Sequence, residues 1–346
     1  MKRRLGSGAD LLKSRRFWVR LLVLLAVLFF LVRPLVPRVG NAAGQLEVVN
    51  PWLTALGFGL QVASLLCYSV MTRAALGEGR NVIGLGRLFR IQLVSRAVSS
   101  TVPGGAAAGP TVGYRLMTSA GVYGQRASAA LASASVISAV VLNVLLWSAL
   151  VVSVPSYGFN AVYAGAAVLG ILLMLAVAAV LLSIVDGSQF VQRPVRFFSQ
   201  RVGADPDRVM LSVRNFGEQI QLLGSNRRLL RRLSCWAACN WLLDALSLWV
   251  FLRAFGVAMN PVGVLVAFGV ANVLAAIPIS PGGIGIVEWA YLPILITFGA
   301  TLEQATIAVT SYRVAQFLFP IVLGGLSSVS LTVEARLDRR RAAATG

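Results

Sequence analysis

The sequence contains apolar runs that are long enough to cross a membrane. Six runs of about 20 residues or more are found at roughly 17–36, 51–71, 128–153, 161–184, 233–255 and 304–331. Only 12% of the residues are charged and 57% are hydrophobic, whereas soluble domains carry about 25% charged residues. The chain therefore lacks the polar surface of a soluble domain. An all-α polytopic membrane protein is predicted.

Two further apolar stretches, 88–119 and 263–298, are each interrupted by Pro-Gly-Gly. The residues concerned are Pro103, Gly104, Gly105, Pro281, Gly282 and Gly283. The arms on either side have about 15 residues, which is short for a full crossing. A broken backbone at membrane depth is tolerated where protein or a water-filled cavity surrounds it. We predict two re-entrant helical hairpins beside six full spans, with eight full spans as the alternative.

The positive charges predict the orientation. Lys and Arg number 31, and 24 of them fall in one alternating set of loops and ends. These segments are 1–16, 72–90, 120–127, 186–232 and 332–346. Cytoplasmic loops carry the excess of Lys and Arg. Both basic ends, 1–16 and 332–346, are therefore expected on the cytoplasmic side of a bacterial inner membrane. They flank a transmembrane domain at 17–331, in which 186–232 is predicted to include an amphipathic helix on the inner leaflet.

The two Pro-Gly-Gly sites also belong to an internal repeat. An offset of 178 residues aligns them and pairs Gly121 with Gly299, which gives repeat halves at about 84–153 and 263–331. The first hairpin begins and ends at basic loops, whereas the second is flanked by loops almost without Lys or Arg. An inverted-topology repeat of the kind found in secondary transporters is therefore predicted. A duplicated helix bundle without a transport role is the alternative.

Each Pro-Gly-Gly is expected to precede a return helix whose N-terminus lies deep in the membrane. Free N–H groups and the positive end of the helix dipole favour an anion there, and glycine allows a headgroup to approach the backbone. Two such termini would attract a phosphate. The alternative is that these glycines only allow close helix packing.

Carboxylates within spans are functional candidates because a charge at mid-bilayer is costly. Glu288 lies in the second hairpin, and Arg313, with Gln316 one turn further on, is its expected partner. Arg313 would bind a phosphate bidentately, and Glu288 would meet a cationic headgroup or hold Arg313 in place. A buried structural ion pair is the alternative. Asp244, four residues after Asn240, is interpreted as part of an interhelical hydrogen-bonded pair.

Arg96 and Arg115 are the corresponding headgroup candidates in the first hairpin, unless they extend to the interface instead. The net charge of +19 does not indicate nucleic-acid binding, because the charges fall in short blocks between apolar runs. The absence of His excludes imidazole chemistry. The three cysteines, Cys67, Cys235 and Cys239, lie in apolar runs and are interpreted as packing residues. No metal and no cofactor are expected.

The second-half motif resembles the lysylphosphatidylglycerol synthase transmembrane-domain family. It comprises Ile277-Pro-Ile-Ser-Pro-Gly-Gly-Ile-Gly-Ile-Val-Glu288, Gly299, Ala305, Ser311-Tyr312-Arg313 and Pro320. The likeness extends from about residue 50 to 331. Family members often carry an acidic residue and an Arg after the first Pro-Gly and another acidic residue in the next span. This chain has Ala106–Ala108 and Ser133–Ser135 at those places.

In multidomain members, the resemblance implies, this membrane part flips an aminoacylated phospholipid made by a fused synthase domain. About 15 residues follow the last span here, so a stand-alone membrane domain that is not an enzyme is expected. Other relatives accompany glycosyltransferases that use polyprenyl-phosphate sugars. A translocase of an anionic, aminoacylated or polyprenyl-phosphate-linked lipid is therefore hypothesised. The rivals are a small-solute or ion transporter and a non-transporting partner of a separate synthase or glycosyltransferase.

Overall fold

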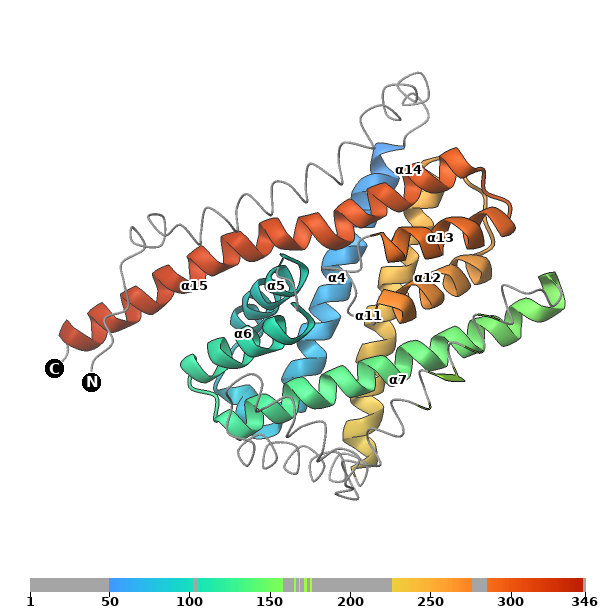
Figure 1. Ribbon diagram of the computed structural model, residues 1–346. Helices are drawn as coiled ribbons and strands as arrows, with labels where there is room; N and C mark the ends of the chain where they lie inside the picture. Colours follow the sequence, from blue (N-terminus) through green and yellow to red (C-terminus); the bar gives the residue numbers. More distant parts are fainter. Residues whose placement is uncertain are drawn as a thin grey trace, which may run out of the picture. The chain divides into compact units, whose positions relative to one another are not determined.

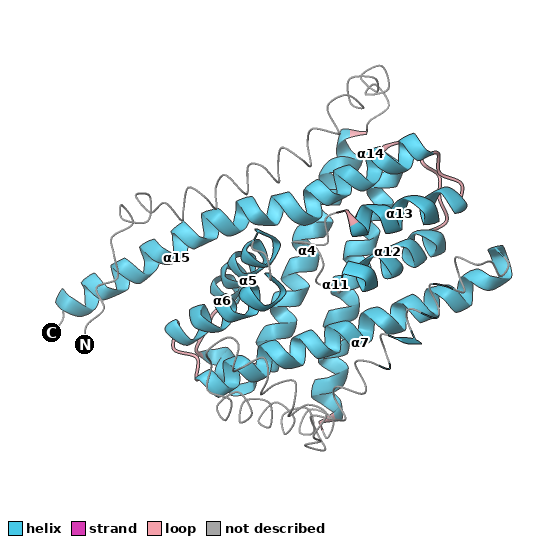
Figure 2. Cartoon of the chain, in the orientation of Figure 1, coloured by secondary structure: helices cyan, strands magenta, loops and turns pink. Residues whose placement is uncertain are grey.

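The computed structural model describes residues 50–101, 105–157, 226–275 and 285–344, together with five single positions between 165 and 175. These residues form helices joined by short loops, and no strand occurs among them (Figures 1 and 2). The predicted span at 17–36 and the segment 186–225 lie outside the described residues, as does most of 161–184. The all-α prediction is confirmed.

Four helical runs are long and apolar enough to cross a membrane. They are α4 (Pro51–Ala75), α7 (Gly124–Tyr157), α11 (Arg227–Ala254) and the continuous run of α14 (Leu302–Arg313), the π-helical turn η4 (Val314–Leu318) and α15 (Phe319–Ala344). These runs match the spans predicted at 51–71, 128–153, 233–255 and 304–331. The start of α4 illustrates the local cause. The Asn50 side chain accepts hydrogen bonds from the first-turn N–H groups of Trp52 and Leu53, and Pro51 takes the first helical position.

Both predicted hairpins are confirmed as pairs of short helices that pack against each other. The first is α5 (Leu85–Thr101) with α6 (Gly105–Ser119), and the second is α12 (Pro261–Ala275) with α13 (Ile286–Thr297). At 1.5 Å per residue these helices are only about 18–26 Å long. The hydrocarbon core of a bilayer is about 30 Å thick. Each arm is thus too short to cross it comfortably.

The repeat extends further than predicted, because the same offset also relates α4 to α11. These two helices pack along each other in antiparallel directions. Asn50 at the start of α4 donates its N–H to the Ala254 carbonyl at the end of α11 at 3.4 Å, and the Ser247 hydroxyl donates to the Gly57 carbonyl at 2.9 Å. Equivalent helices that run in opposite directions are what an inverted repeat requires.

The two repeats also exchange their hairpins (Figure 1). The α5–α6 hairpin of the first repeat packs along α15 of the second, while α12 of the second packs against α7 of the first. The last turn of each hairpin is equivalent as well, since Gly121 and Gly299 adopt left-handed φ values of 94° and 99° that favour glycine. Ala127 and Ala305, which follow at equivalent positions, are both fully buried.

The hairpins open toward opposite ends of the helix bundle. The open end of the first is packed with the end of α4 and with α15, through Leu76, Leu88 and Leu331. Arg90 at this end forms an ion pair with Glu334 at 2.9 Å. The open end of the second hairpin lies instead beside the last residues of α11, in a cluster that includes Leu252, Val257, Val264 and Ala300. This arrangement agrees with the opposite orientations inferred from the loop charges.

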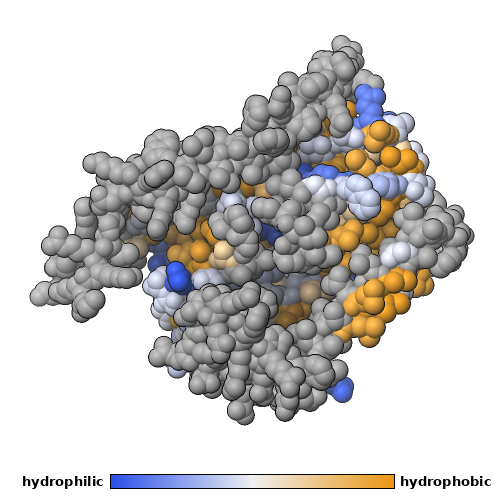
Figure 3. Space-filling model, in the orientation of Figure 1, coloured by the Kyte–Doolittle hydropathy of each residue, from blue (hydrophilic) through white to orange (hydrophobic). Residues whose placement is uncertain are grey.

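Large apolar side chains remain exposed on the outside of the bundle. Val144, Val151 and Val152 on α7 are more than 40% exposed, and Trp289 on α13 is 74% exposed. In the view of Figure 3 a hydrophobic surface lies over the second half of α7. Such surfaces suit contact with lipid tails, which is what the composition predicts for this chain.

Candidate functional site

A connected set of polar side chains lies inside the bundle where α4, α11, α13 and the α14–η4 turn meet. Its members are Gln61, Asp244, Glu288, Tyr312, Arg313 and Gln316. Gln61 is ten residues from the start of α4 and 14 from its end, or about 15 and 21 Å along the helix. The set, which we call the polar network, is therefore near the middle of the bundle's length.

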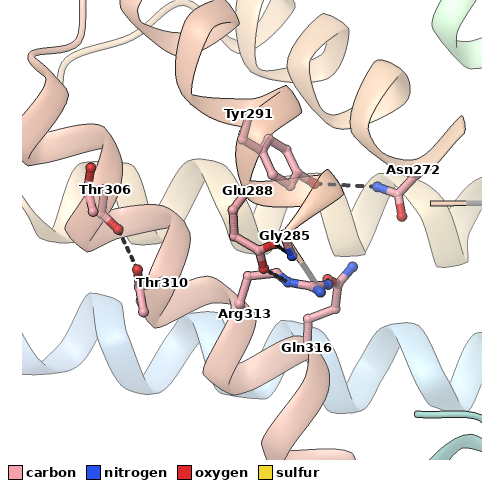
Figure 4. A network of polar contacts seen from close by, with 8 residues as sticks. All are labelled: Asn272, Gly285, Glu288, Tyr291, Thr306, Thr310, Arg313 and Gln316. Carbon is pink, nitrogen blue, oxygen red and sulfur yellow. Dashed lines mark hydrogen bonds and ion pairs between the residues drawn. The ribbon is translucent and has the colours of Figure 1, made fainter. Parts of the chain in front are cut away.

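Glu288 lies in the first turn of α13 and makes two hydrogen bonds. Its Oε2 atom accepts a hydrogen bond from the Gly285 N–H at 2.6 Å, and its Oε1 atom accepts one from Arg313 Nε at 2.7 Å (Figure 4). Gly285 precedes the helix with a left-handed φ of 87°, a conformation that favours glycine. The carboxylate thus places a negative charge at the N-terminus of α13, where the helix dipole favours an anion. The predicted ion pair between Glu288 and Arg313 is confirmed.

Arg313 is only 7% exposed and is held by a second contact. Its Nη1 atom donates to Gln316 Oε1 at 2.9 Å, which confirms the expected proximity of Gln316. The guanidinium also lies 5.5 Å from the centre of the Phe317 ring, within the range of a cation–π contact. The π-helical turn Val314–Leu318 begins directly after Arg313. Single π turns of this kind are frequent at functional sites.

Asp244 joins the network to the central α4–α11 pair. Its Oδ1 atom accepts from Gln61 Nε2 at 2.6 Å and from the Tyr312 hydroxyl at 2.7 Å, and its Oδ2 atom accepts from Gln316 Nε2 at 3.3 Å. Asp244 is 5% exposed. The Gln316 amide is therefore fixed at both ends, with its oxygen on Arg313 and its nitrogen on Asp244.

The interhelical hydrogen bonding predicted for Asp244 is confirmed by its bond to Gln61 of α4, and Ser64 of α4 donates to the Asn240 backbone carbonyl at 3.0 Å. The contact of Asp244 with α14 was not predicted. Gln61 and Tyr312 were missed as members of the network. A polar Gln61 in the middle of an apolar span was the available signal, because such residues usually face the bundle interior.

The first hairpin carries no counterpart of this network in the described residues. The offset of 178 places Pro110 opposite Glu288 and Ser135 opposite Arg313. Arg96 and Arg115 have exposed side chains, and no hydrogen bond or ion pair joins either one to the network in the part that the structure describes. Their assignment to a headgroup remains a prediction.

The turns between the hairpin arms bear on the predicted anion sites. Pro103, Gly104, Pro281, Gly282 and Gly283 lie outside the described residues, and their proposed role stays a prediction. Gly105 is the first residue of α6, as expected of a return helix. In α13, which begins at Ile286, the N-terminal N–H of Gly285 is already bonded to Glu288. An external anion there would have to compete with that carboxylate.

Close contacts between helices account for several glycines. The Ser95 hydroxyl of α5 donates to the Gly109 carbonyl of α6 at 2.6 Å, and a Cβ atom on Gly109 would lie 1.8 Å from Ser99 Oγ.

Among the described residues, no group of three or more His, Cys, Asp and Glu could hold a metal ion. Cys67, Cys235 and Cys239 are free thiols.

Comparison with known proteins places this sequence in a family. The family described as the lysylphosphatidylglycerol synthase TM region matches residues 17–324. The chain belongs to this family. A UPF0104 membrane protein of Methanothermobacter thermautotrophicus is 24% identical over 342 residues, covering 92% of this chain and 94% of that protein. The glycosyltransferase AglD of Haloferax volcanii is 28% identical over 142 residues, which are 39% of this chain and 23% of that protein.

Family membership and the four long apolar helices together make the chain a multi-pass α-helical membrane protein. The resemblance read from the Pro-Gly-Gly and Ser-Tyr-Arg motifs of the second half is confirmed. The polar network includes residues of that same motif, Glu288, Tyr312 and Arg313.

Proposed function

We propose that the protein is a translocase that moves the polar headgroup of an anionic lipid between the two leaflets. The single observation that carries the proposal is the buried Arg313, paired near mid-length of the bundle with Glu288 in the first turn of α13. A charged pair in the interior of a membrane protein is costly to maintain and usually marks a substrate path. The lipid class would be aminoacylated, polyprenyl-phosphate-linked or another anionic type.

In this proposal the headgroup phosphate competes with Glu288 for Arg313. Glu288 is the more accessible partner, with 26% of its side chain exposed against 7% for Arg313. A guanidinium binds phosphate as well as carboxylate in the bidentate mode, so the exchange would replace one anion by another. The acyl tails would stay in the bilayer beside the exposed apolar faces of the helices.

The inverted repeat supports a rocking motion that exposes the site to either side in turn. The protein would sit in the cytoplasmic membrane of a bacterial cell with both ends inside, as the loop charges predict. It would make or break no covalent bond and would need no metal or other cofactor.

A second candidate role is that of a membrane partner for a separate glycosyltransferase or lipid synthase. The observation that favours it is the similarity of 142 residues to part of a protein named as a glycosyltransferase. Such a partner would co-purify with its enzyme and would move no lipid alone. A small-solute or ion transporter built on the same repeat is the third candidate.

Reconstitution separates these roles. Vesicles containing the purified chain would carry a headgroup-labelled phosphatidylglycerol, its aminoacyl ester or a polyprenyl-phosphate sugar, and leaflet exchange would be followed by quenching from outside. We expect Glu288→Gln and Arg313→Gln to slow exchange at least about tenfold, the equivalent of about 1.4 kcal/mol of barrier. Arg90→Gln is the control, because it removes a surface ion pair away from the network. Unchanged exchange in folded Glu288→Gln and Arg313→Gln would refute the assignment.

A further inference from the structure

Asp244 is surrounded by hydrogen-bond donors. Gln61 Nε2 and the Tyr312 hydroxyl lie 2.6 and 2.7 Å from Oδ1, while Gln316 Nε2 lies 3.3 Å from Oδ2. An ionised carboxylate only accepts hydrogen bonds, so this arrangement fits an ionised Asp244. Oδ2, which has the longest of the three contacts, is the oxygen most readily given to another partner.

The charges of the polar network do not balance. It contains two carboxylates, Asp244 and Glu288, and one guanidinium, Arg313, among the residues that the structure describes. The sequence between the two arms of the second hairpin, 276–284, has no charged residue to add. Within the described residues the network thus has one carboxylate more than it has guanidinium groups, and charges in the interior of a membrane protein are expensive. A bound cation or proton would remove that cost.

The chemistry around Asp244 favours a proton over a metal cation. Hard cations are held by several oxygen ligands, but the atoms directed at Asp244 are two amide nitrogens and a phenol O–H. A proton needs only one oxygen on Asp244 and one acceptor opposite it. The Gln316 amide can supply that acceptor by turning its oxygen toward Asp244.

We propose that Asp244 is a proton-binding site whose occupancy controls the release of Arg313. A proton taken from water binds Oδ2 and forms an O–H group that requires an acceptor. The Gln316 amide rotates to offer Oε1, which brings its NH₂ group to Arg313 Nη1. Since both groups are donors, the 2.9 Å bond between Arg313 and Gln316 is lost. Arg313 then turns more easily toward a phosphate, and loss of the proton restores the present arrangement.

The other titratable groups near Asp244 come from α13 and α14. Tyr312 bonds to Asp244 directly, and the Tyr291 ring lies against the Tyr312 ring with centroids 6.1 Å apart. Gln316 connects Asp244 to Arg313, and Arg313 in turn is paired with Glu288. On the α4 side the contact is with Gln61, which does not titrate. Asp244 is therefore the carboxylate that links proton binding to the ion pair.

The inference deepens the proposed function and rests on it for the coupling to lipid, but proton binding itself can be tested without lipid movement. Infrared difference spectra of the full chain between alkaline and acidic buffer should contain a carboxylic-acid C=O band that Asp244→Asn removes and Glu288→Gln retains. In Gln316→Leu the band should persist at a shifted frequency, because the acid loses its acceptor. The Gln316→Leu spectrum keeps the test valid if Asp244→Asn does not fold.

Spectra without an Asp244 band, or a band unmoved in Gln316→Leu, would overturn the proton site while leaving the translocase proposal intact. For the coupling, leaflet exchange of labelled phosphatidylglycerol should depend on pH in the wild type and lose that dependence in Gln316→Leu. Equal pH dependence in both proteins would overturn the coupling. If no lipid exchanges under any condition but the band behaves as described, the proposed function fails and the proton site stands.

Discussion

Glu288→Gln is the most informative single substitution because glutamine has nearly the same shape but only one side-chain oxygen. Glu288 uses both of its oxygens, one on Arg313 Nε at 2.7 Å and one on the Gly285 N–H at 2.6 Å. In the variant the amide oxygen can serve only one of these donors, and the NH₂ group faces the other. Either the α13 cap or the partner of a 93% buried Arg313 is lost.

The magnitude follows from the contacts. A hydrogen bond to a charged group contributes about 1.5–3 kcal/mol, and breaking a fully buried ion pair costs about 3–5 kcal/mol. Because a quarter of the Glu288 side chain is exposed and one of its two bonds survives, we expect a loss of about 2–3 kcal/mol in the free energy of unfolding. Equilibrium unfolding of the purified protein in mixed detergent micelles, followed by circular dichroism, measures this loss.

Glu334→Gln is the matched control. Its carboxylate pairs with Arg90 at 2.9 Å and Arg87 at 3.7 Å, and all three side chains are about one-third exposed. Exposed pairs of this kind contribute less than about 1 kcal/mol. Equal losses in Glu288→Gln and Glu334→Gln would refute the view that the buried pair has a special structural role. The double variant Glu288→Gln/Arg313→Gln should lose less than the sum of its single variants, because neither buried group is then left charged.

Two further predictions concern the helix packing and the topology. Gly324→Ala should destabilise the protein by about 1–3 kcal/mol relative to Gly325→Ala. A Cβ atom on Gly324 would lie 2.5 Å from the Leu93 carbonyl oxygen, whereas a Cβ atom on Gly325 would meet no atom within 4 Å. Thermal unfolding of the two variants tests this prediction, and equal melting temperatures would contradict it. Single cysteines at the exposed Tyr123 and Leu302, in a chain without its native cysteines, should react with impermeant maleimide from the cytoplasmic and the opposite side, respectively. Labelling of both from one side would contradict the inverted orientation.

The fold was predictable where one physical rule acted on a long segment. Apolar length alone indicated α4, α7, α11 and the α14–α15 run, because a membrane core demands about 20 apolar residues. The hairpins followed from Pro-Gly-Gly, and their opposite orientations from the distribution of Arg. The relation between α4 and α11 as equivalent helices of the repeat was not predicted from the sequence. These helices share the offset but little sequence, since packing in lipid constrains residue size and not identity.

The site was predictable only in part. The pairing of Glu288 with Arg313 could be predicted because an unpaired charge inside a membrane is energetically costly. Two opposite charges in neighbouring apolar segments have few other partners. The roles of Gln61 and Tyr312 could not be predicted in the same way. A polar Gln61 in an apolar span is expected to face the bundle interior, but the contacts of Gln61 and Tyr312 with Asp244 depend on the rotation of three helices about their axes. No pattern within a single helix specifies that rotation.

The contrast between a symmetric fold and an asymmetric polar network limits how the protein can work. If both repeats bound the headgroup, each hairpin would need its own charged pair, but the first has Pro110 and Ser135 where the second has Glu288 and Arg313. The central helices differ as well, since Leu66 of α4 is the counterpart of Asp244 in α11. Under the proposed function the symmetry would serve the motion, by giving two similar packings of the bundle, while the buried ion pair of the described residues belongs to the second repeat. On this reasoning, substitutions in the network should abolish transport in both directions, because one site must serve both sides of the membrane.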